Sequence, residues 1–310
     1  MKILFVGDSI PRLNPAGDSS LAMVRAAMAA KLEVYWVTPE NLWQRGSDIW
    51  AATEKLEPFL KDRLPGTAGG EKRTLSDFKA IFIRKDPPFD TAYVQLCWQL
   101  SLYEEKIFQL NRASLLLRHH EKMIPFEAVR QGFLSESDLI PTFIGSQTRA
   151  ESWAKEHGYH DLVVKPYLGH GGEEIAQTTV ANLNKITFKH AMMVQPLRPE
   201  VKELGDRRVL YLNGEILGDV VRVPKAGSIV SNLAQGGAAV HRPMDAAEMA
   251  AAKKVGAFLK KEGIFFAGSD MIGPKVSEVN ITSPTGLRSL EKLHGDDKAT
   301  PIIQAVLAQL

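Results

Sequence analysis

The sequence is poor in cysteine, in long apolar runs and in net charge. Its 310 residues contain one cysteine, Cys97, which excludes an intrachain disulfide. No apolar run is long enough to span a bilayer. The 38 basic and 36 acidic side chains leave a formal net charge of only +2, which argues against bulk electrostatic binding of nucleic acid or a membrane. We therefore predict a cytoplasmic protein that recognises anions only locally.

The composition is that of an ordinary globular protein, with 45% hydrophobic and 24% charged residues. The length suggests two or three domain-sized units. Cys97 lies in the apolar stretch AYVQLCWQL, where we expect a small buried side chain rather than a nucleophile.

Strand and helix patterns alternate in the first third of the chain. A buried strand, an amphipathic helix and a second strand follow one another, and this β-α-β order predicts a parallel sheet with right-handed crossovers. The segment 62–73 is rich in Gly, Pro and charge, and we predict an exposed loop. The expected strands are 2–8, 33–39, 80–86 and 106–110, and the expected helices are 20–31 and near 90–103.

The remainder of the chain has shorter strands and antiparallel signals. A hairpin over 207–224 is expected to turn at Asn213–Gly214, and a second hairpin over 264–282 to turn near Gly273–Pro274. The other expected strands are 141–146, 161–166, 173–179 and 191–197, and the expected helices are 148–158, 246–263 and 301–310.

The stretch VVKPYLGHGGEEI (163–175) places a lysine at the end of a strand and glycines after it. Backbone N–H groups of Gly169, Gly171 and Gly172 can approach phosphate oxygens, and Lys165 can supply a charge for the same anion. The alternative is a flexible hairpin loop with a solvated lysine. Neither the Walker pattern nor the dinucleotide-binding pattern is present.

A second lysine, Lys122, follows two histidines in HHEKM (119–123). It is a candidate phosphate ligand, and the alternative is a surface lysine on a helix. We do not expect His119 and His120 to share a metal, because adjacent residues of a helix do not face one site.

The segment 194–210 begins as a strand and is broken by two prolines. The break is expected to leave backbone groups of Gln195 and Leu197 without regular partners, so that they can read an adenine edge. Asp206 and Arg208 then share a face of the next strand. The alternative interpretation is that Asp206 and Arg208 only form ion pairs at the base of a hairpin.

The last hairpin carries three oxygen-bearing side chains. Glu278 and Asn280 lie two residues apart on one strand, and Asp270 on the other strand is expected to lie opposite Glu278. Such a set is suited to Mg²⁺. The alternative is a solvated strand face.

These pieces, in this order, resemble the ATP-grasp fold, and more closely the bacterial glutathione synthetases. The resemblance covers nearly the whole chain and is most specific at IRKDPPFD (83–90). It implies an α/β protein that is α+β in its C-terminal half, with an ATP-grasp fold preceded by an N-terminal Rossmann-like parallel-sheet domain. The units implied are 1–118, 119–195 and 196–310. Other matching segments are FVGDSIPRLNPAGDSS, GDRRVLYLNGE, SNLAQGG (231–237), GSDMIG and EVNITSPT.

The resemblance also implies a reaction: ATP-dependent amide formation through an acyl phosphate, from γ-glutamylcysteine and glycine, with Mg²⁺ or alternatively Mn²⁺. It also implies a homo-oligomer, because related ligases often assemble as tetramers. The roles implied are ATP binding for Lys122, Lys165, Gly169, Gly171, Gly172, Gln195, Pro196, Leu197, Arg198 and Asp206; metal binding for Asp270, Glu278 and Asn280; catalysis for Arg208, Arg222 and Asn232; and substrate support for Thr282, Ser283, Pro284 and Thr285.

One departure from the family pattern concerns substrate. Val230–Ser231 stands where the family has Arg-Gly, and Arg207 and Arg242 are candidates to replace the lost charge. This departure leaves two alternatives to glutathione synthesis. One is an ATP-grasp carboxylate–amine ligase with other substrates, and the other is a nucleotide-binding regulator without catalysis.

Overall fold

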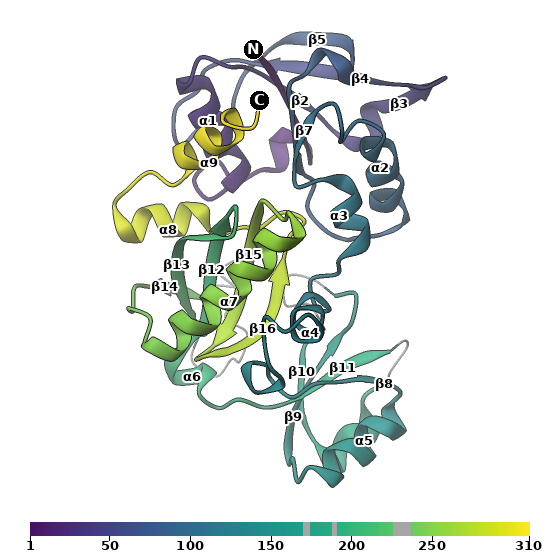
Figure 1. Cartoon of the computed structure of the whole chain (residues 1–310), viewed down its shortest axis with the longest axis vertical. Coiled ribbons are helices and arrows are strands. Elements are labelled where there is room, and N and C mark those ends of the chain that lie inside the picture. Colours follow the sequence, from purple (N-terminus) through teal and green to yellow (C-terminus); the bar gives the residue numbers. More distant parts are fainter. Residues whose placement is uncertain (170–173, 188–190, 226–236) are drawn as a thin grey trace.

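The computed structural model describes residues 1–169, 174–187, 191–225 and 237–310. Three sheets follow one another along the long axis of the molecule (Figure 1). The first is built from β1–β7, the second along this axis from β12–β16, and the last from β8–β11. The sequence prediction of a mixed α/β protein with an antiparallel C-terminal half is confirmed.

The first sheet has the predicted parallel core. β1 pairs in parallel with β2 on one side and with β6 on the other, and β7 pairs in parallel with β6. Apolar side chains of β1 are buried along its length, as expected for a strand covered on both faces. The bounds are Lys2–Gly7 (β1), Glu33–Val37 (β2), Ala80–Arg84 (β6) and Phe108–Leu110 (β7).

An antiparallel extension of this sheet is absent from the sequence prediction. The added strands are Leu42–Arg45 (β3), Asp48–Leu56 (β4) and Thr67–Thr74 (β5). The expected loop over 62–73 is therefore wrong in its second half, where β5 pairs with β4. β5 is an edge strand exposed over most of its length, so burial imposes no apolar alternation that a sequence pattern could reveal.

Helices of the first half begin at recognisable caps. Asp18 accepts a hydrogen bond from the Leu21 amide at the start of α1, and Asp90 accepts one from the Tyr93 amide at the start of α2. Cys97 is fully buried in α2, and burial raises the pKa of its thiol to about 12, so it is no nucleophile. The helices are Ser19–Ala29 (α1), Thr91–Ser101 (α2), Ala113–Arg118 (α3) and Ile124–Arg130 (α4).

The sheet at the far end is antiparallel, in the order β10-β9-β11-β8, with α5 packed against it (Figure 1). A separate small core holds it together, formed by Ala150, Ala154, Leu162, Val164, Val180, Leu183 and Val194. Its elements are Phe143–Gly145 (β8), Gln147–Glu156 (α5), Asp161–Pro166 (β9), Ala176–Thr179 (β10) and Met192–Pro196 (β11).

The middle sheet, in the order β14-β13-β12-β15-β16, contains both predicted hairpins. Asn213 and Gly214 have positive φ values of 49° and 80°, as a tight two-residue turn requires. α7 covers the sheet and ends at Gly263, which has a φ of 74°. The elements are Val201–Leu204 (α6), Asp206–Leu212 (β12), Glu215–Val223 (β13), Ala238–Val240 (β14), Ala246–Glu262 (α7), Phe266–Ile272 (β15) and Lys275–Asn280 (β16).

The chain ends on the first sheet. Two final helices, Leu287–His294 (α8) and Ala299–Leu307 (α9), pack against α1, so the yellow end of the ribbon lies beside its purple beginning (Figure 1). The proposed third unit, 196–310, therefore contributes two helices to the first. Among the described residues, no helix combines the length and hydrophobicity needed to cross a membrane.

Candidate active site

The last hairpin brings its three oxygen-bearing side chains together as predicted. Asp270 on β15 is the register partner of Glu278 on β16, and Asn280 pairs with Gly268 two residues earlier on β15. The Asn280 side-chain oxygen accepts a hydrogen bond from the Thr282 hydroxyl at 3.3 Å. Two carboxylates and one amide oxygen thus face a common region of neighbouring strands.

Two arginines hold Asp270, which is only 7% exposed. The Arg208 side chain donates from Nε to Oδ1 at 2.5 Å and from an Nη atom to Oδ2 at 2.8 Å, and Arg222 approaches Oδ2 to 2.9 Å. Burial by itself raises the pKa of Asp270, but the two guanidinium groups outweigh it and hold this pKa well below its usual range. Asp270 is therefore firmly ionised.

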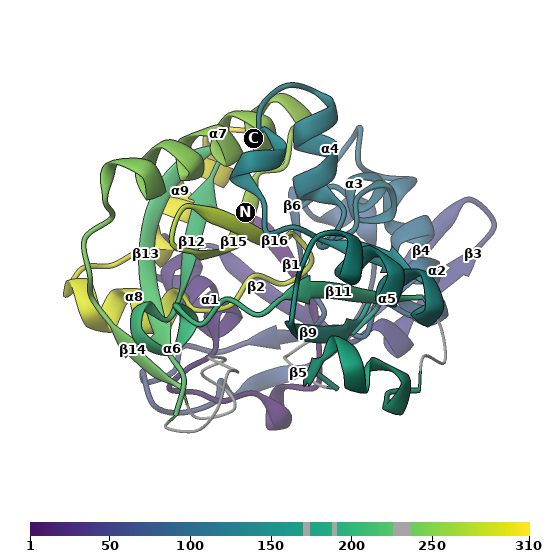
Figure 2. The same ribbon diagram turned by 90° about the horizontal axis from the view of Figure 1, so that it is seen from below.

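Lys165 reaches the same hairpin from β9. Its Nζ lies 3.5 Å from the Ser277 hydroxyl on β16, and Figure 2 shows β16 as the strand of the middle sheet on the side of β9 and β11. Burial lowers the pKa of Lys165, while Glu278 and Asp270 oppose that shift. A lysine with this environment is not the solvated loop lysine of the alternative interpretation.

Lys122 is also not a surface lysine on a helix. It lies in the turn between α3 and α4, is 3% exposed, and donates a hydrogen bond to the Gly169 carbonyl at the start of the glycine loop. A side chain at Gly169 would place Cβ 2.4 Å from Pro166, so only glycine fits this bend. Gly171 and Gly172 lie outside the described residues.

Glu121 belongs to this site, although sequence reasoning missed it. Its carbonyl accepts a hydrogen bond from the Val279 amide at 2.9 Å, and its carboxylate lies 3.3 Å from Lys122 Nζ. Burial and then Glu121 raise the pKa of Glu278, whereas the positive charge of Lys165 lowers it. In the sequence, the only indication of this was that Glu121 directly precedes Lys122. The hydrogen bond between Glu121 and β16 can be seen only in the three-dimensional structure.

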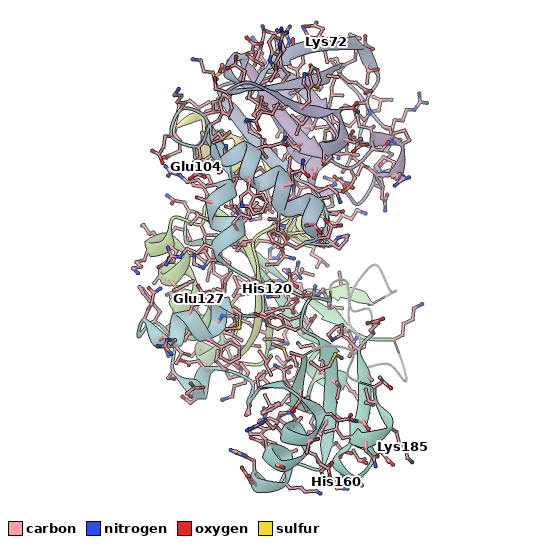
Figure 3. The ribbon with its side chains drawn as sticks, turned by 90° about the vertical axis from the view of Figure 1, so that its right-hand side faces the viewer. Lys72, Glu104, His120, Glu127, His160 and Lys185 are labelled. Carbon is pink, nitrogen blue, oxygen red and sulfur yellow. The ribbon has the colours of Figure 1, made fainter. Side chains whose placement is uncertain are left out.

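The two histidines point to different partners, as expected. His119 Nδ1 lies 2.5 Å from Glu127, whereas the His120 ring stacks on Tyr167 with centroids 4.7 Å apart. His120 lies near the middle of the molecule in Figure 3, close to Glu127. However, the premise that both histidines lie on a helix is wrong, because α3 ends at Arg118.

The backbone prediction for the adenine segment is partly wrong. The Leu197 amide donates to the Asp161 carbonyl at 2.8 Å, so pairing with β9 continues past Pro196. Gln195 is a buried residue of β11, and its side chain donates to the Thr142 hydroxyl at 2.8 Å. Arg198 lies nearby in an ion pair of 3.0 Å with Glu200.

The hairpin base is ion-paired, as the alternative interpretation for Asp206 stated. Arg222 donates to both oxygens of Asp206, its register partner across the hairpin, with an Nε–Oδ1 distance of 2.7 Å. Arg222 thereby links Asp206 to Asp270 of the last hairpin.

Arg207 and Arg242 do not replace the positive charge missing at Val230–Ser231. Arg207 is 1% exposed and pairs with Asp219 and Glu248, and Arg242 pairs with the same Glu248 at 2.6 Å. Both charges are therefore neutralised within a structural network. Val230, Ser231 and Asn232 themselves lie outside the described residues.

The segment 282–285 joins two sheets. The Pro284 carbonyl accepts a hydrogen bond from Arg84 of the first sheet at 3.1 Å, and the Thr285 carbonyl accepts one from Arg208 at 3.2 Å. Ser283 is buried, and its hydroxyl lies 3.5 Å from the Arg84 carbonyl. Ser283 and Pro284 therefore position the segment, while Thr285 is exposed.

The donor set fits a hard divalent cation bound with ATP phosphates. Asp270, Glu278 and Asn280 offer only oxygen, which is what Mg²⁺ prefers, and one or two carboxylates with phosphates are its usual ligands. Within the described ranges, no three Asp, Glu, His or Cys side chains converge as an all-protein metal site. Lys122 and Lys165 both act electrostatically on Glu278, and an ammonium group is a suitable partner for a phosphate oxygen.

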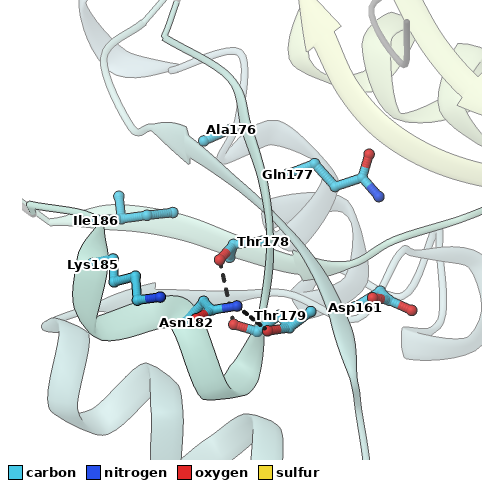
Figure 4. Close-up of a pocket in the computed structure, with 8 residues that line it drawn as sticks. All are labelled: Asp161, Ala176, Gln177, Thr178, Thr179, Asn182, Lys185 and Ile186. Carbon is cyan, nitrogen blue, oxygen red and sulfur yellow. Dashed lines mark hydrogen bonds between the residues drawn. The ribbon is translucent and has the colours of Figure 1, made fainter. Parts of the chain in front are cut away.

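A separate hollow is formed at β10 and the turn that follows it. It has a volume of about 620 Å³ and is lined by polar side chains of β10 and the following turn, including Thr178, Thr179 and Asn182 (Figure 4). Asn182 donates to the Thr179 hydroxyl at 3.1 Å. This hollow is open and carries none of the predicted site residues.

Comparisons with known sequences agree with this geometry. Residues 1–116 match the family description "Prokaryotic glutathione synthetase, N-terminal domain", and residues 133–295 match "Prokaryotic glutathione synthetase, ATP-grasp domain". The chain is 35% identical over 320 residues to a glutathione synthetase of Prochlorococcus marinus subsp. pastoris, covering 99% of both chains. A glutathione synthetase from another strain of Prochlorococcus marinus is 35% identical over 325 residues, covering 100% of both.

Solved structures show the same fold at low sequence identity. A D-cycloserine synthetase superposes with a TM-score of 0.69 at 14% identity, covering 99% of each chain. A RimK-domain ATP-grasp protein of Sphaerobacter thermophilus superposes with a TM-score of 0.63 at 17% identity, covering 99% of this chain and 100% of the other.

Proposed function

This chain belongs to the prokaryotic glutathione synthetase family, and from that premise we propose that it joins γ-glutamylcysteine to glycine. It is an ATP-dependent, amide-forming ligase, and ATP-grasp enzymes of this family use a divalent metal with the nucleotide. The observation that carries the proposal is the meeting of Lys165 from one sheet with Asp270 and Glu278 from another.

The proposed roles follow from the positions of the side chains. Lys122 and Lys165 neutralise phosphate oxygens, and Asp270, Glu278 and Asn280 hold Mg²⁺, with Mn²⁺ as an alternative. A divalent ion at this position neutralises phosphate charge and favours transfer of the γ-phosphoryl group. The remaining nucleotide contacts are assigned to Gly169, Gly171, Gly172, Gln195, Pro196, Leu197, Arg198 and Asp206.

The arginines act on the reacting carboxylate. A carboxylate resists nucleophilic attack because of its negative charge, and phosphorylation converts it into an acyl phosphate with a good leaving group. Arg208 and Arg222 already surround one anion, Asp270, and we assign them, with Asn232, to charge stabilisation during phosphoryl transfer. Thr285 and Thr282 are assigned to the glycine or dipeptide end, positioned by Ser283 and Pro284.

The decisive experiment is an acceptor and donor panel with ATP and Mg²⁺, read by phosphate release and product mass. We expect γ-glutamylcysteine and glycine to give glutathione and one ADP per amide bond. Lys165→Met should lower kcat by about 10²–10³-fold, since it removes a charge aimed at the phosphates. Lys155→Met is the control, because Lys155 lies on the surface of α5.

If a different donor and acceptor pair turns over while γ-glutamylcysteine and glycine are inert, the proposed substrates are wrong. The assignment as an ATP-dependent ligase would still hold. We also propose that the chain forms a homo-oligomer, with the tetramer of related ligases as the expected form. We further propose a cytoplasmic location, and partners that are small molecules rather than nucleic acid or membrane. Light scattering on the purified chain measures the oligomeric state.

A further inference from the structure

Two exposed histidines meet at the β14 edge of the middle sheet, outside the proposed chemistry. His241 directly follows β14, and His294 is the last residue of α8. α8 packs against β13 and β14, and Figure 1 shows it beside both strands. The fold therefore brings together two imidazole rings from separate elements. Neither histidine is among the residues assigned to ATP, Mg²⁺ or substrate.

The separation of the two rings suits the coordination of one metal ion. Their centroids lie 4.9 Å apart, and their planes meet at 81°. An imidazole nitrogen binds Zn²⁺ at about 2.0–2.1 Å, so the centroids of two rings on one ion lie roughly 4.5–5.2 Å apart for angles between square-planar and tetrahedral. The observed separation falls within this range. Ordinary aromatic pairs reach similar distances, so the distance alone does not distinguish a metal site from a packing contact.

His294 also makes the hydrogen bond that is typical of a metal-binding histidine. Its Nε2 atom lies 3.0 Å from the backbone carbonyl oxygen of Asp219. Because a carbonyl oxygen only accepts, Nε2 carries the proton, and the neutral ring keeps a lone pair on Nδ1. Metal-binding histidines almost always donate their other ring N–H to a carbonyl, a carboxylate or water, which fixes the tautomer and raises the basicity of the ligating nitrogen. Packing of two rings does not require this bond.

Both histidines are anchored to the same strand, β13. Asp219, whose carbonyl orients His294, belongs to β13, and this strand pairs with β12. His241 follows Val240, which is the register partner of Val221 on β13. Regular strands position a site more precisely than loops do. The two rings are therefore held close together by the sheet itself.

The cationic groups next to the two rings are already paired with carboxylates. Arg242, which follows the first histidine, pairs with Glu248 at 2.6 Å. Lys298 pairs with Asp296 at 2.9 Å. Asp296 is also close enough to His294 for their charges to interact through space. Because these positive charges are balanced locally, they do not prevent a cation from binding between the rings.

We propose that His241 and His294 together bind one late first-row transition-metal ion, such as Zn²⁺, Cu²⁺ or Ni²⁺, which ties the chain after β14 to the end of α8. Imidazole suits these ions, whereas Mg²⁺ prefers oxygen ligands. Within the described ranges, no third Asp, Glu, His or Cys side chain completes a metal-binding group, so water fills the remaining coordination positions. The site is independent of the proposed function.

The bound ion acts as a reversible clamp on α8. It fixes the end of this helix to the middle sheet, while α8 also packs against α1 beside the first sheet. An ion that binds the folded chain in preference to the unfolded chain stabilises the protein by mass action. Zn²⁺ should therefore raise the Tm through this site. Ligase turnover with Mg²⁺ needs neither histidine.

Calorimetric titration of the full chain with Zn²⁺ tests the proposal, with excess Mg²⁺ present to occupy oxygen ligands. The wild-type chain should bind one more Zn²⁺ than the double variant His241→Asn/His294→Asn. Each single variant should bind that ion at least about tenfold more weakly. His157→Asn is the matched control. His157 is also exposed, and its Nδ1 lies 2.9 Å from a backbone carbonyl oxygen, but its ring neighbours are Trp153 and Tyr159.

Two further measurements identify the ligands and the clamp. Paramagnetic resonance of the wild-type chain with one equivalent of Cu²⁺ should show coupling to two nitrogens, and each single variant should show coupling to one. This spectrum of the wild-type chain does not depend on the folding of any variant. Zn²⁺ should raise the Tm of the wild-type protein and leave the Tm of the double variant unchanged.

Three results would overturn the proposal. The first is equal Zn²⁺ stoichiometry and affinity in the wild-type chain and the double variant. The second is a loss of affinity in only one of the two single variants, which would mean that one histidine acts alone. The third is an equal loss in His157→Asn, which would mean that Zn²⁺ binds exposed histidines without selecting this pair.

Discussion

Arg208 and Asp270 face each other on neighbouring strands, β12 and β15, and form a two-point ion pair. Arg222 binds Oδ2 of the same carboxylate. Arg208 therefore donates one hydrogen bond to each oxygen of Asp270, and Arg222 adds a second positive charge 2.9 Å from Oδ2. Both arginines compete with any cation that approaches this carboxylate.

Competition between guanidinium and metal follows from this pairing. We expect Arg222→Gln to raise the affinity of the nucleotide-free protein for Mn²⁺ by about tenfold, because it removes a positive charge that lies 2.9 Å from Oδ2 of Asp270. The same change should lower kcat. Paramagnetic resonance titration with Mn²⁺ measures the affinity directly, without turnover.

Arg242→Gln is the matched control for charge, since Arg242 pairs with Glu248 away from the hairpin. Equal Mn²⁺ affinities for wild-type and Arg222→Gln protein would contradict the competition. A weaker affinity in the Arg222 variant would show instead that this arginine supports the metal site.

The network around Arg207 is predicted to serve stability rather than catalysis. Arg207 is almost fully buried between Asp219 and Glu248, and it also donates to the Arg242 and Pro243 carbonyls. Arg207→Met should lower the free energy of unfolding by about 3–5 kcal/mol, because two carboxylates lose a buried partner. Arg242→Met, at a more exposed position on the same Glu248, should cost about 1 kcal/mol or less.

Urea unfolding measures both variants, and steady-state kinetics at a temperature where both are folded measures activity. Loss of catalysis in Arg207→Met without loss of stability would contradict the structural role. That outcome would return Arg207 to the substrate side, where the sequence first suggested it.

His120 makes stability depend on pH below neutrality. Burial, and then Lys122, lower the pKa of His120 to about 4, whereas an unfolded histidine titrates near 6.5. Below about pH 6.5 the unfolded chain takes up a proton at His120 that the folded chain does not. The contribution of His120 to the free energy of unfolding therefore falls between about pH 6.5 and pH 4, and it does not change above pH 6.5. Since the ring is partly exposed, we expect a loss of about 1–2 kcal/mol.

Urea midpoints of wild-type and His120→Asn protein between pH 7.5 and 5 measure this effect. The slope over that range should be shallower in His120→Asn. His160→Asn is the control, because His160 is exposed at the far end of the molecule (Figure 3). Identical slopes for wild-type and His120→Asn protein would rule out His120 as the source.

Much of the fold was predictable because the patterns behind it are local. The parallel strands, the Asn213–Gly214 turn and the last hairpin each depend on residues close in sequence. The pairing of Asp270 with Glu278 followed from that hairpin, since a tight turn determines which residues face each other. The exposed edge strand β5 was missed because no buried face shaped its sequence.

The amino-acid sequence by itself determined the class of fold, the pairing of Asp270 with Glu278 in the last hairpin and the membership of a ligase family. Tertiary structure alone decided that Arg207 pairs with Glu248 and that Asp270 pairs with two arginines, and it chose the ion-paired alternative for Asp206. It also decided that Arg84 stays without a counter-ion among the described residues and meets the segment 282–285. The physical reason is that periodicity and turn chemistry act over a few residues, whereas the partner of a buried charge comes from a segment far along the chain. The separation is 41 residues for Arg207 and Glu248, 62 for Arg208 and Asp270, and 200 for Arg84 and the Pro284 carbonyl.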